Sequence, residues 1–386
     1  MGETGTPARH RAPSDLAPWT ETVVRLSLAL VFLYLFLVGV KSLETGISSF
    51  GSDLVDRVFA SVANPIAALA AGILATVLVQ SSSVTTATIV GLVGAGVLPV
   101  ETAVPMVMGA NIGTTVTNTL ASLGHVRQGA YFERAFSAAT IHDYFNLIAV
   151  AILLPLEIAF GLITRIATGI EELVEGLLPE VGTGSSPVKA AIKAPVDWIS
   201  QTIESLGWQS AEGVILLVLG IGFIFVALWM ITRQMKLVMS GRMENAINAI
   251  LSKGAGAGAL LVGVVMTVAV QSSSITTSIM VPLVAAGVLT LENAFPVTLG
   301  ANIGTTITAL LASIAAESPD ALTIALAHVT FNVLGILIIY PFPRVRAIPL
   351  RLAQLTAAAA TKRKMLVVGY VVGLFVLAPL AILLIA

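Results

Sequence analysis

Long apolar runs alternate along the chain with apolar stretches that are interrupted by small and polar residues. Four runs are long enough to cross a bilayer, which requires about 20 residues. They are residues 23–40, 147–163 with a few preceding residues, 213–232 and 365–386. The other apolar stretches are rich in Gly, Pro, Ser and Thr, so we expect broken helices and re-entrant hairpins there. The pattern predicts an all-α polytopic membrane protein.

Composition supports the same class. The chain has 386 residues, of which 56% are hydrophobic and 11% are charged, and its mean hydropathy is +0.96. Soluble domains carry about 25% charged residues. The net charge of −1 points to no nucleic-acid partner, and the absence of cysteine excludes disulfides and thiolate metal sites.

One segment occurs twice. Residues 80–122 align without gaps with residues 271–313, and 27 of the 43 positions are identical. Shared hydrophobicity does not explain this, because Gln, Ser, Thr, Asn, Gly, Glu and Pro match at fixed offsets. An alternative is that duplicated spans pack through polar residues, but that role needs scattered hydroxyls and not "QSSS" copied unchanged. We therefore expect two repeats.

Charge sets the expected orientation, because basic residues favour the cytoplasmic side. The basic positions are Arg9, Arg11, Arg233, Lys236, Arg242, Lys253, Arg344, Arg346, Arg351, Lys362, Arg363 and Lys364. The acidic positions, expected outside, are Glu171, Glu172, Glu175 and Glu180. The spans before the two copies then run in opposite directions, which predicts inverted-topology repeats of the kind found in secondary transporters, with a site where the repeats meet.

These observations divide the chain into six parts. We expect a disordered cytoplasmic tail (1–21), repeat 1 (22–163), an extracellular or amphipathic connector (164–210), repeat 2 (211–341), a basic cytoplasmic segment (342–364) and a C-terminal transmembrane helix (365–386). The N-terminus should be cytoplasmic and the C-terminus extracellular or periplasmic.

The polar motifs predict helix ends inside the membrane. The tract "QSSS" at Gln80 predicts a break, with a new helix near Ser83 capped by Ser82 or Ser83. In "GANIGTT", Gly109 and Gly113 permit an unwound stretch, followed by a cap from one of the Thr residues. Residues 271–274 and 300–306 repeat both motifs.

Such helix ends suit an anion together with cations. A helix start carries about half a positive charge and free N–H donors, while unwound carbonyls and amide oxygens suit hard alkali cations. Between residues 76 and 122 the only charged residue is Glu101, and between 267 and 313 it is Glu292; both are expected in surface turns. An anion there would lack a compensating Lys or Arg, which is expensive in low dielectric. Bound cations would supply that charge, so the two ligands would bind together.

Two other groups of polar residues, the H-x-x-x-N pairs and Asp143, have both a functional and a structural interpretation. Two H-x-x-x-N pairs, His142/Asn146 and His328/Asn332, favour helix contacts over a metal site. Asp143 is a functional candidate because acids at membrane depth are rare. The competing interpretations are that Asp143 lies at the membrane interface or that it forms an ion pair with Arg134.

The combination of motifs resembles the type II sodium–phosphate cotransporter family. The resemblance rests on the paired "QSSS" tracts, "GANIGTTVTNT", "FERAFSAATIHDYFN" and "IALAHVTFNVLGILIIYPFP", and it runs from about residue 26 to the last span. It implies sodium-coupled symport of inorganic phosphate, mainly the divalent ion, into the cell by alternating access at the plasma (inner) membrane. It also implies that the protein is not an enzyme and has no cofactor beyond the co-transported sodium.

The resemblance assigns site residues by their place in the motifs. Phosphate contacts are expected at Gln80, Ser81, Ser82, Ser83, Gln271, Ser272, Ser273, Ser274, Asn111 and Asn302. Sodium contacts are expected at Gln80, Ser83, Thr85, Thr114, Thr115, Asp143, Gln271, Ser274, Thr276, Thr305 and Thr306. The family associates the Asp of its "HD" motif with an additional sodium ion, so Asp143 implies electrogenic transport.

Several alternatives remain open on sequence grounds. Dipole sites discriminate anions poorly, so a sodium-coupled carrier of another small oxyanion or a dicarboxylate is the main one. A channel would conduct passively, and an intramembrane serine hydrolase would need a base and an orienting group, of which the motifs give no sign. Lipid surrounds the protein, and a homodimer is compatible with a sequence that does not fix the oligomeric state.

Overall fold

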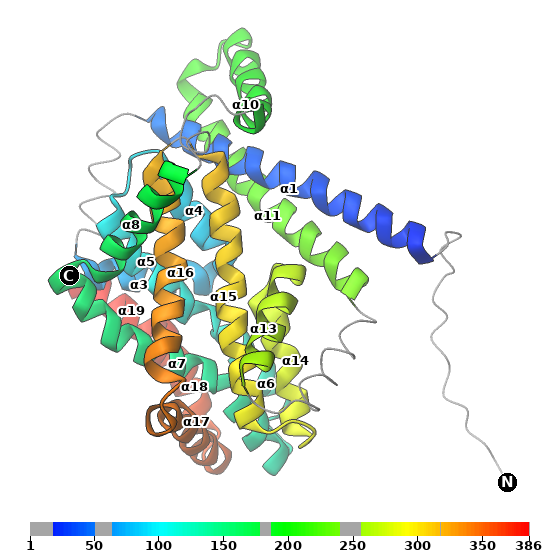
Figure 1. Cartoon of the computed structure of the whole chain (residues 1–386), viewed down its shortest axis with the longest axis vertical. Helices are drawn as coiled ribbons and strands as arrows, with labels where there is room; N and C mark the ends of the chain where they lie inside the picture. The colour runs from blue at the N-terminus through cyan, green and yellow to red at the C-terminus, as the bar shows by residue number, and fades with distance from the viewer. Residues whose placement is uncertain (1–17, 51–63, 178–186, 240–255, 317, 386) are drawn as a thin grey trace.

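The computed structural model describes residues 18–50, 64–177, 187–239, 256–316 and 318–385. Within these residues the chain forms helices and turns without a strand (Figure 1). Six of the described helices are long and apolar enough to cross a membrane. They are α1 (Pro18–Ser48), α7 (Ala130–Phe160), α11 (Glu212–Met239), α15 (Leu291–Ala315), α16 (Pro319–Ile339) and the C-terminal run Met365–Ile385. The protein is an all-α polytopic membrane protein.

The four predicted spans all fall in these helices, but two helices were missed. α7 begins 17 residues before the predicted 147–163 run and ends at Phe160, where Gly161 turns the chain with a φ of 59°. The two missed helices are α15, which is continuous although its sequence is dense in Gly, Pro, Ser and Thr, and α16, which is also continuous. Small residues in these helices serve close packing, so their density does not signal a break.

The described parts of the flanking segments are mostly helical. α1 begins at Pro18, three residues before the expected end of the tail; residues 1–17, with Arg9 and Arg11, lie outside the described part. Glu180, Arg242 and Lys253 also lie outside it. The expected connector contains α8 (Leu162–Leu177) and α10 (Pro187–Ser205), and the basic segment forms α17 (Pro343–Lys362).

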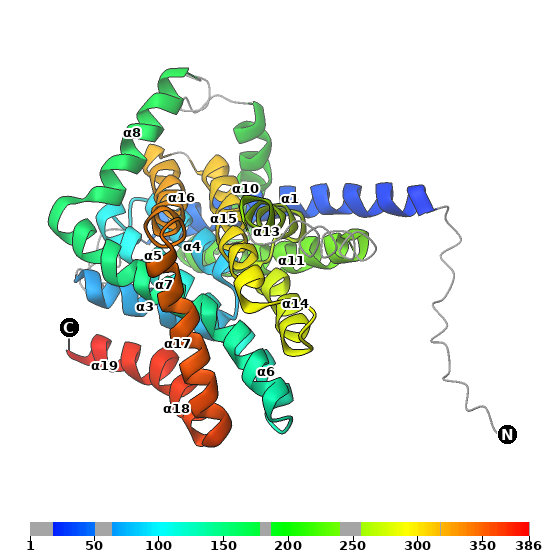
Figure 2. The same cartoon turned by 60° about the horizontal axis from the view of Figure 1, so that its bottom comes forward.

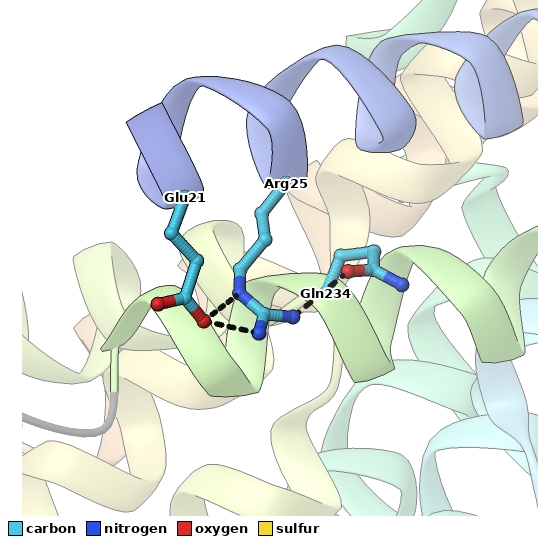
Figure 3. Close-up of polar contacts among 3 residues, drawn as sticks. All are labelled: Glu21, Arg25 and Gln234. Carbon is cyan, nitrogen blue, oxygen red and sulfur yellow. Dashed lines mark hydrogen bonds and ion pairs between the residues drawn. The ribbon is translucent and has the colours of Figure 1, made fainter. Parts of the chain in front are cut away.

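Helices α1 and α11 form an antiparallel pair that extends away from the other helices in Figures 1 and 2. Gly39 of α1 approaches the backbone of Gly220, and Gly46 approaches Gly213. Towards the other end, Arg25 Nε donates to Glu21 Oε1 at 3.0 Å and Arg25 Nη1 donates to Gln234 Oε1 at 3.3 Å (Figure 3). The two helices that precede the aligned copies, residues 80–122 and 271–313, therefore run in opposite directions side by side.

Each repeat contains a helical hairpin too short to cross a bilayer as two full spans. In repeat 1 it is α3 (Pro65–Val79) and α4 (Ser82–Gly94); in repeat 2 it is α13 (Ala257–Val270) and α14 (Ser273–Ala285). In both hairpins the chain reverses at a glutamine in the left-handed conformation, with φ of 56° at Gln80 and 57° at Gln271. These are the non-glycine residues with positive φ in the described part of the chain. This rare conformation, shared by both copies, ends the first helix of each hairpin.

The "GANIGTT" motifs stay helical around their asparagines, contrary to our expectation of an unwound stretch there. The first is interrupted only at its last residue, Thr115, which separates α5 (Val100–Thr114) from α6 (Val116–Ser122) and precedes α6 without a side-chain cap; the second lies inside the continuous helix α15. A Cβ atom at Gly109 would lie 2.0 Å from the Leu69 carbonyl oxygen, and one at Gly300 would lie 1.9 Å from that of Leu260. The glycines thus allow α5 to pack directly on α3, and α15 on α13.

We expect Gly300→Ala to destabilise the protein, because the added methyl group must push α15 away from α13. Overpacking of this kind costs about 1–3 kcal/mol, so the midpoint of thermal unfolding of the purified protein should fall by several degrees. Gly258→Ala is the matched control, since nothing lies within 4 Å of its Cβ position on α13. An equal midpoint in the two variants would contradict the packing argument.

Candidate functional site

The two "QSSS" tracts, 191 residues apart in sequence, line one pocket. Its volume is about 270 Å³, and all eight residues 80–83 and 271–274 contribute to its wall. Helix α11 closes another side with Phe225, Leu228, Trp229 and Thr232. Every described residue in this lining is uncharged. The structure therefore brings together eight of the predicted site residues and adds a wall from α11 that the motifs did not indicate.

Both second hairpin helices begin at this pocket. Ser81 Oγ accepts from Val84 N at 3.3 Å, and Ser272 Oγ accepts from Ile275 N at 3.4 Å. The caps are thus Ser81 and Ser272, one residue earlier than expected in repeat 1. Capping uses the third N–H of each helix, so the N–H groups of the first two residues remain outside the helical hydrogen-bond ladder. Two partly positive helix ends therefore meet at one small cavity.

The glutamine side chains are held in the same way in both copies. Gln80 Nε2 donates to the Val77 carbonyl at 2.6 Å, and its Oε1 accepts from Thr117 Oγ1 at 3.3 Å. In repeat 2, Gln271 Nε2 donates to the Val268 carbonyl at 2.7 Å and Oε1 accepts from Thr308 Oγ1 at 3.2 Å. The Thr117 hydroxyl comes from α6, which comes directly after α5, and the Thr308 hydroxyl comes from α15; each one fixes the tip of its hairpin.

Thr117 and Thr308 were not among the predicted site residues. The signal was present, because both are identical threonines two positions after "GANIGTT" in the aligned copies. No local pattern connects each threonine to a glutamine 37 residues earlier, because that contact depends on the parallel packing of α5 on α3 and of α15 on α13.

Six predicted sodium residues do not line the pocket. Their hydroxyls donate to carbonyls of their own helices: Thr85 to Ser81, Thr114 to Ala110, Thr115 to Ile112, Thr276 to Ser272, Thr305 to Ala301 and Thr306 to Ile303. Thr276 Oγ1 also accepts from Thr267 Oγ1 at 2.9 Å. None of the six appears in the lining of the pocket.

Asn302 takes part in a hydrogen-bonded layer between the repeats. Its Oδ1 contacts His142 Nε2, and its Nδ2 donates to Asn146 Oδ1 at 2.8 Å. Asn146 Nδ2 donates in turn to the Asn111 carbonyl at 2.8 Å. The first H-x-x-x-N pair therefore makes a helix contact, as expected, and both predicted asparagines lie away from the pocket lining.

The second H-x-x-x-N pair has no corresponding layer. Both ring nitrogens of His328 and Oδ1 of Asn332 are buried without a hydrogen-bond partner among the described residues. The Asn111 side chain, which corresponds to Asn302, donates to the Val107 carbonyl of its own helix at 3.1 Å. The two halves are thus equivalent at the hairpin tips and different at this layer.

Asp143 is fully buried in the interior of α7. Its Oδ2 accepts from Thr119 Oγ1 at 3.2 Å and from Tyr370 OH at 2.8 Å, while Oδ1 is buried without a partner. The alternative pairing with Arg134 is wrong, because Arg134 Nε donates to the Ala285 carbonyl at 2.8 Å. The carboxylate also has no exposed surface, so Asp143 does not lie on the outside of the protein.

Asn118 links the two repeats directly. Its Nδ2 donates to Thr277 Oγ1 at 2.6 Å, and its Oδ1 accepts from Ser278 Oγ at 2.9 Å. The aligned position in repeat 2 is Ala309, which has no polar side chain. The two acids of the repeats, Glu101 and Glu292, are exposed in the first turns of α5 and α15, as expected.

Comparison with known proteins places this geometry in context. The model of the Na+/Pi-cotransporter family matches residues 35–177 and 223–360. Sodium-dependent phosphate transport protein 2A of Oryctolagus cuniculus is 34% identical over 430 residues, which cover 93% of this chain and 67% of that protein. Sodium-dependent phosphate transport protein 2B of Homo sapiens is 32% identical over 446 residues, which cover 93% and 64%. No solved structure matches the chain significantly.

The shared pocket predicts a specific cross-link. The chain has no cysteine, so paired substitutions are the only thiols present. Val79→Cys and Ser274→Cys, from different hairpins, both face the pocket and neither residue caps a helix. A short bifunctional methanethiosulfonate should join them within one chain, as measured by intact mass.

The control pair is Val79→Cys with Val288→Cys, because Val288 is 52% exposed but lies outside the pocket lining. This pair should acquire two separate labels and no bridge. Absence of a bridge in the first pair would show that the hairpin tips do not share a cavity, and equal bridging in both pairs would show that the reagent does not report on it.

Proposed function

Because this chain belongs to the Na+/Pi-cotransporter family, we propose that it is a symporter that carries inorganic phosphate into the cell together with sodium. The observation that carries the proposal is the convergence of two polar hairpin tips on one uncharged pocket. The family is one of transporters, so we assign no catalytic residue.

The pocket offers an anion many donors and little charge. The starts of α4 and α14 provide backbone N–H groups, and the serine hydroxyls of residues 81–83 and 272–274 provide further donors. Two helix starts supply only about one unit of positive charge together. A doubly charged phosphate would remain undercompensated in a low-dielectric site. Sodium ions entering with it would supply the remaining charge, and this shared requirement couples the two fluxes.

We propose that the two copies are inverted repeats that expose the pocket alternately to the two sides. The matching hairpin geometry and the antiparallel arrangement of α1 and α11 support this. The basic residues near the ends of α11 and α17 favour a plasma-membrane orientation with the N-terminus cytoplasmic and the C-terminus outside.

We assign phosphate to the eight tip residues and place the sodium contacts around them. Gln80, Ser83, Gln271 and Ser274 line the pocket and have oxygens suited to sodium. The hydroxyls of Thr85, Thr114, Thr276, Thr305 and Thr306 donate to backbone carbonyls and keep oxygen lone pairs for sodium, but these residues do not line the pocket, so they would contribute only if its wall rearranges. Asn111 and Asn302 act behind the pocket through contacts between helices.

Asp143 and Thr115 form a second candidate sodium site, separate from the pocket at the hairpin tips. A buried carboxylate with one unpartnered oxygen is costly unless a cation is bound. The Thr115 and Thr119 hydroxyls lie beside it, which gives a set of hard oxygen ligands. A sodium ion carried here would move net positive charge with phosphate, so we propose electrogenic transport.

The proposed function is tested by uptake of labelled phosphate into proteoliposomes. Replacement of sodium by choline should abolish uptake against a gradient. Gln80→Ala and Gln271→Ala should each reduce the rate at least tenfold, because each releases a hairpin tip from Thr117 or Thr308. Gln201→Ala, an exposed glutamine on α10, is the matched control and should behave as wild type.

Competition then identifies the anion. Unlabelled arsenate, sulfate and succinate should compete less well than phosphate; stronger competition by one of them would assign that anion as substrate. Full sodium-dependent rates in both glutamine variants would refute the site.

Asp143→Gly should reduce the net charge moved per phosphate, because it removes the buried carboxylate that would hold one sodium ion. The measurement compares current with tracer uptake in the same proteoliposomes. Glu101→Gln is the control, since this exposed acid lies in a surface turn. An unchanged ratio of charge to phosphate in Asp143→Gly would exclude the electrogenic role.

A further inference from the structure

The C-terminal helix contributes a hydroxyl to the buried acid. Tyr370 lies in α18 (Met365–Val372), beyond residue 360, where the match to the family model ends. The TM segment that contains α18 is otherwise mostly exposed; Val367 and Phe375 are buried on it. The Tyr370 hydroxyl donates to Asp143 Oδ2 at 2.8 Å across 227 residues of sequence.

Aromatic contacts hold this hydroxyl in place. The Tyr370 ring lies edge-to-face with Phe136 at 6.0 Å and with Phe375 at 6.3 Å between centroids. It also lies 6.3 Å from the ring of Tyr144, whose hydroxyl contacts Thr356 of α17. A π-helical turn, Gly373–Leu377, follows directly, and such turns are rare and concentrate at functional sites. α18 is therefore fixed at the point where it meets Asp143.

The carboxylate is satisfied on one oxygen only. Oδ2 accepts from both Thr119 and Tyr370, whereas Oδ1 has no partner among the described residues. Two donors on the same oxygen fix the orientation of the carboxylate and leave the other oxygen as the available ligand. A negative oxygen held open in this way is suited to a small cation.

We propose that Tyr370 is a positioning residue for the sodium ion at Asp143, so that α18 sets the sodium affinity of the transporter. This inference rests on the sodium role of Asp143 stated under Proposed function. Removal of the hydroxyl allows the carboxylate to turn and lowers the affinity for sodium, while the phosphate pocket at the hairpin tips stays intact.

The test is Tyr370→Phe, which deletes one oxygen and keeps the ring contacts. The sodium concentration for half-maximal phosphate uptake should rise about tenfold, which corresponds to about 1.4 kcal/mol. The phosphate KM at saturating sodium should stay within twofold of wild type. Tyr131→Phe is the control: it deletes a hydroxyl on the same helix as Asp143 that instead faces the Pro282 carbonyl.

A double-mutant cycle separates positioning from a general structural effect. In an Asp143→Asn background, Tyr370→Phe should cause no further change in sodium dependence. A second measurement, the sodium concentration that half-maximally raises the unfolding temperature of the purified protein, needs no transport and should shift in the same direction.

The outcomes distinguish the two claims. If Asp143→Asn alters sodium dependence and Tyr370→Phe does not, the inference about Tyr370 is wrong and the sodium role of Asp143 stands. If Asp143→Asn leaves both sodium dependence and charge movement unchanged, the premise itself fails. An equal loss of phosphate affinity and sodium affinity in Tyr370→Phe would show a general structural role and overturn the inference.

Discussion

The architecture depends on one constraint: a chain that reverses direction inside a bilayer must satisfy or use its free backbone groups. Gln80 and Gln271 meet this constraint in the same way, with a left-handed backbone and a side chain bonded on both ends. The serine after each glutamine caps the next helix. The first residues of both helices line a common cavity, so the backbone donors that the fold leaves unused lie at that cavity.

Close packing makes this reversal possible. The hairpin tips stay fixed because Thr117 and Thr308 lie within hydrogen-bond distance of the glutamines. Thr117 lies in α6, which comes directly after α5, and Thr308 lies in α15. The short distances therefore require α5 and α15 to lie directly on the first hairpin helices, which Gly109 and Gly300 permit. In each half, the close approach at the glycine and the hydrogen bond from the threonine to the glutamine therefore link the packing of the helices to the shape of the pocket.

Much of this arrangement was predictable, and the errors have identifiable causes. Repetition of "QSSS" predicted two equivalent helix breaks, since a copied polar tract in apolar sequence needs a common reason. The glycines of "GANIGTT" were misinterpreted because a glycine that permits unwinding and one that permits close approach look identical in sequence. Tyr370 was not predicted, because its relation to Asp143 spans 227 residues and follows no local pattern. A contact of this kind depends on tertiary packing alone.

The side chain of Asn118 has a consequence for energetics. It bonds to two hydroxyls of α14, whereas Ala309 at the equivalent place bonds to none. A carrier built from two perfectly matched halves would have no intrinsic preference for either face of the membrane. Here the halves differ by these polar links and by His328, whose ring nitrogens have no hydrogen-bond partner among the described residues, so the two halves are not energetically equivalent.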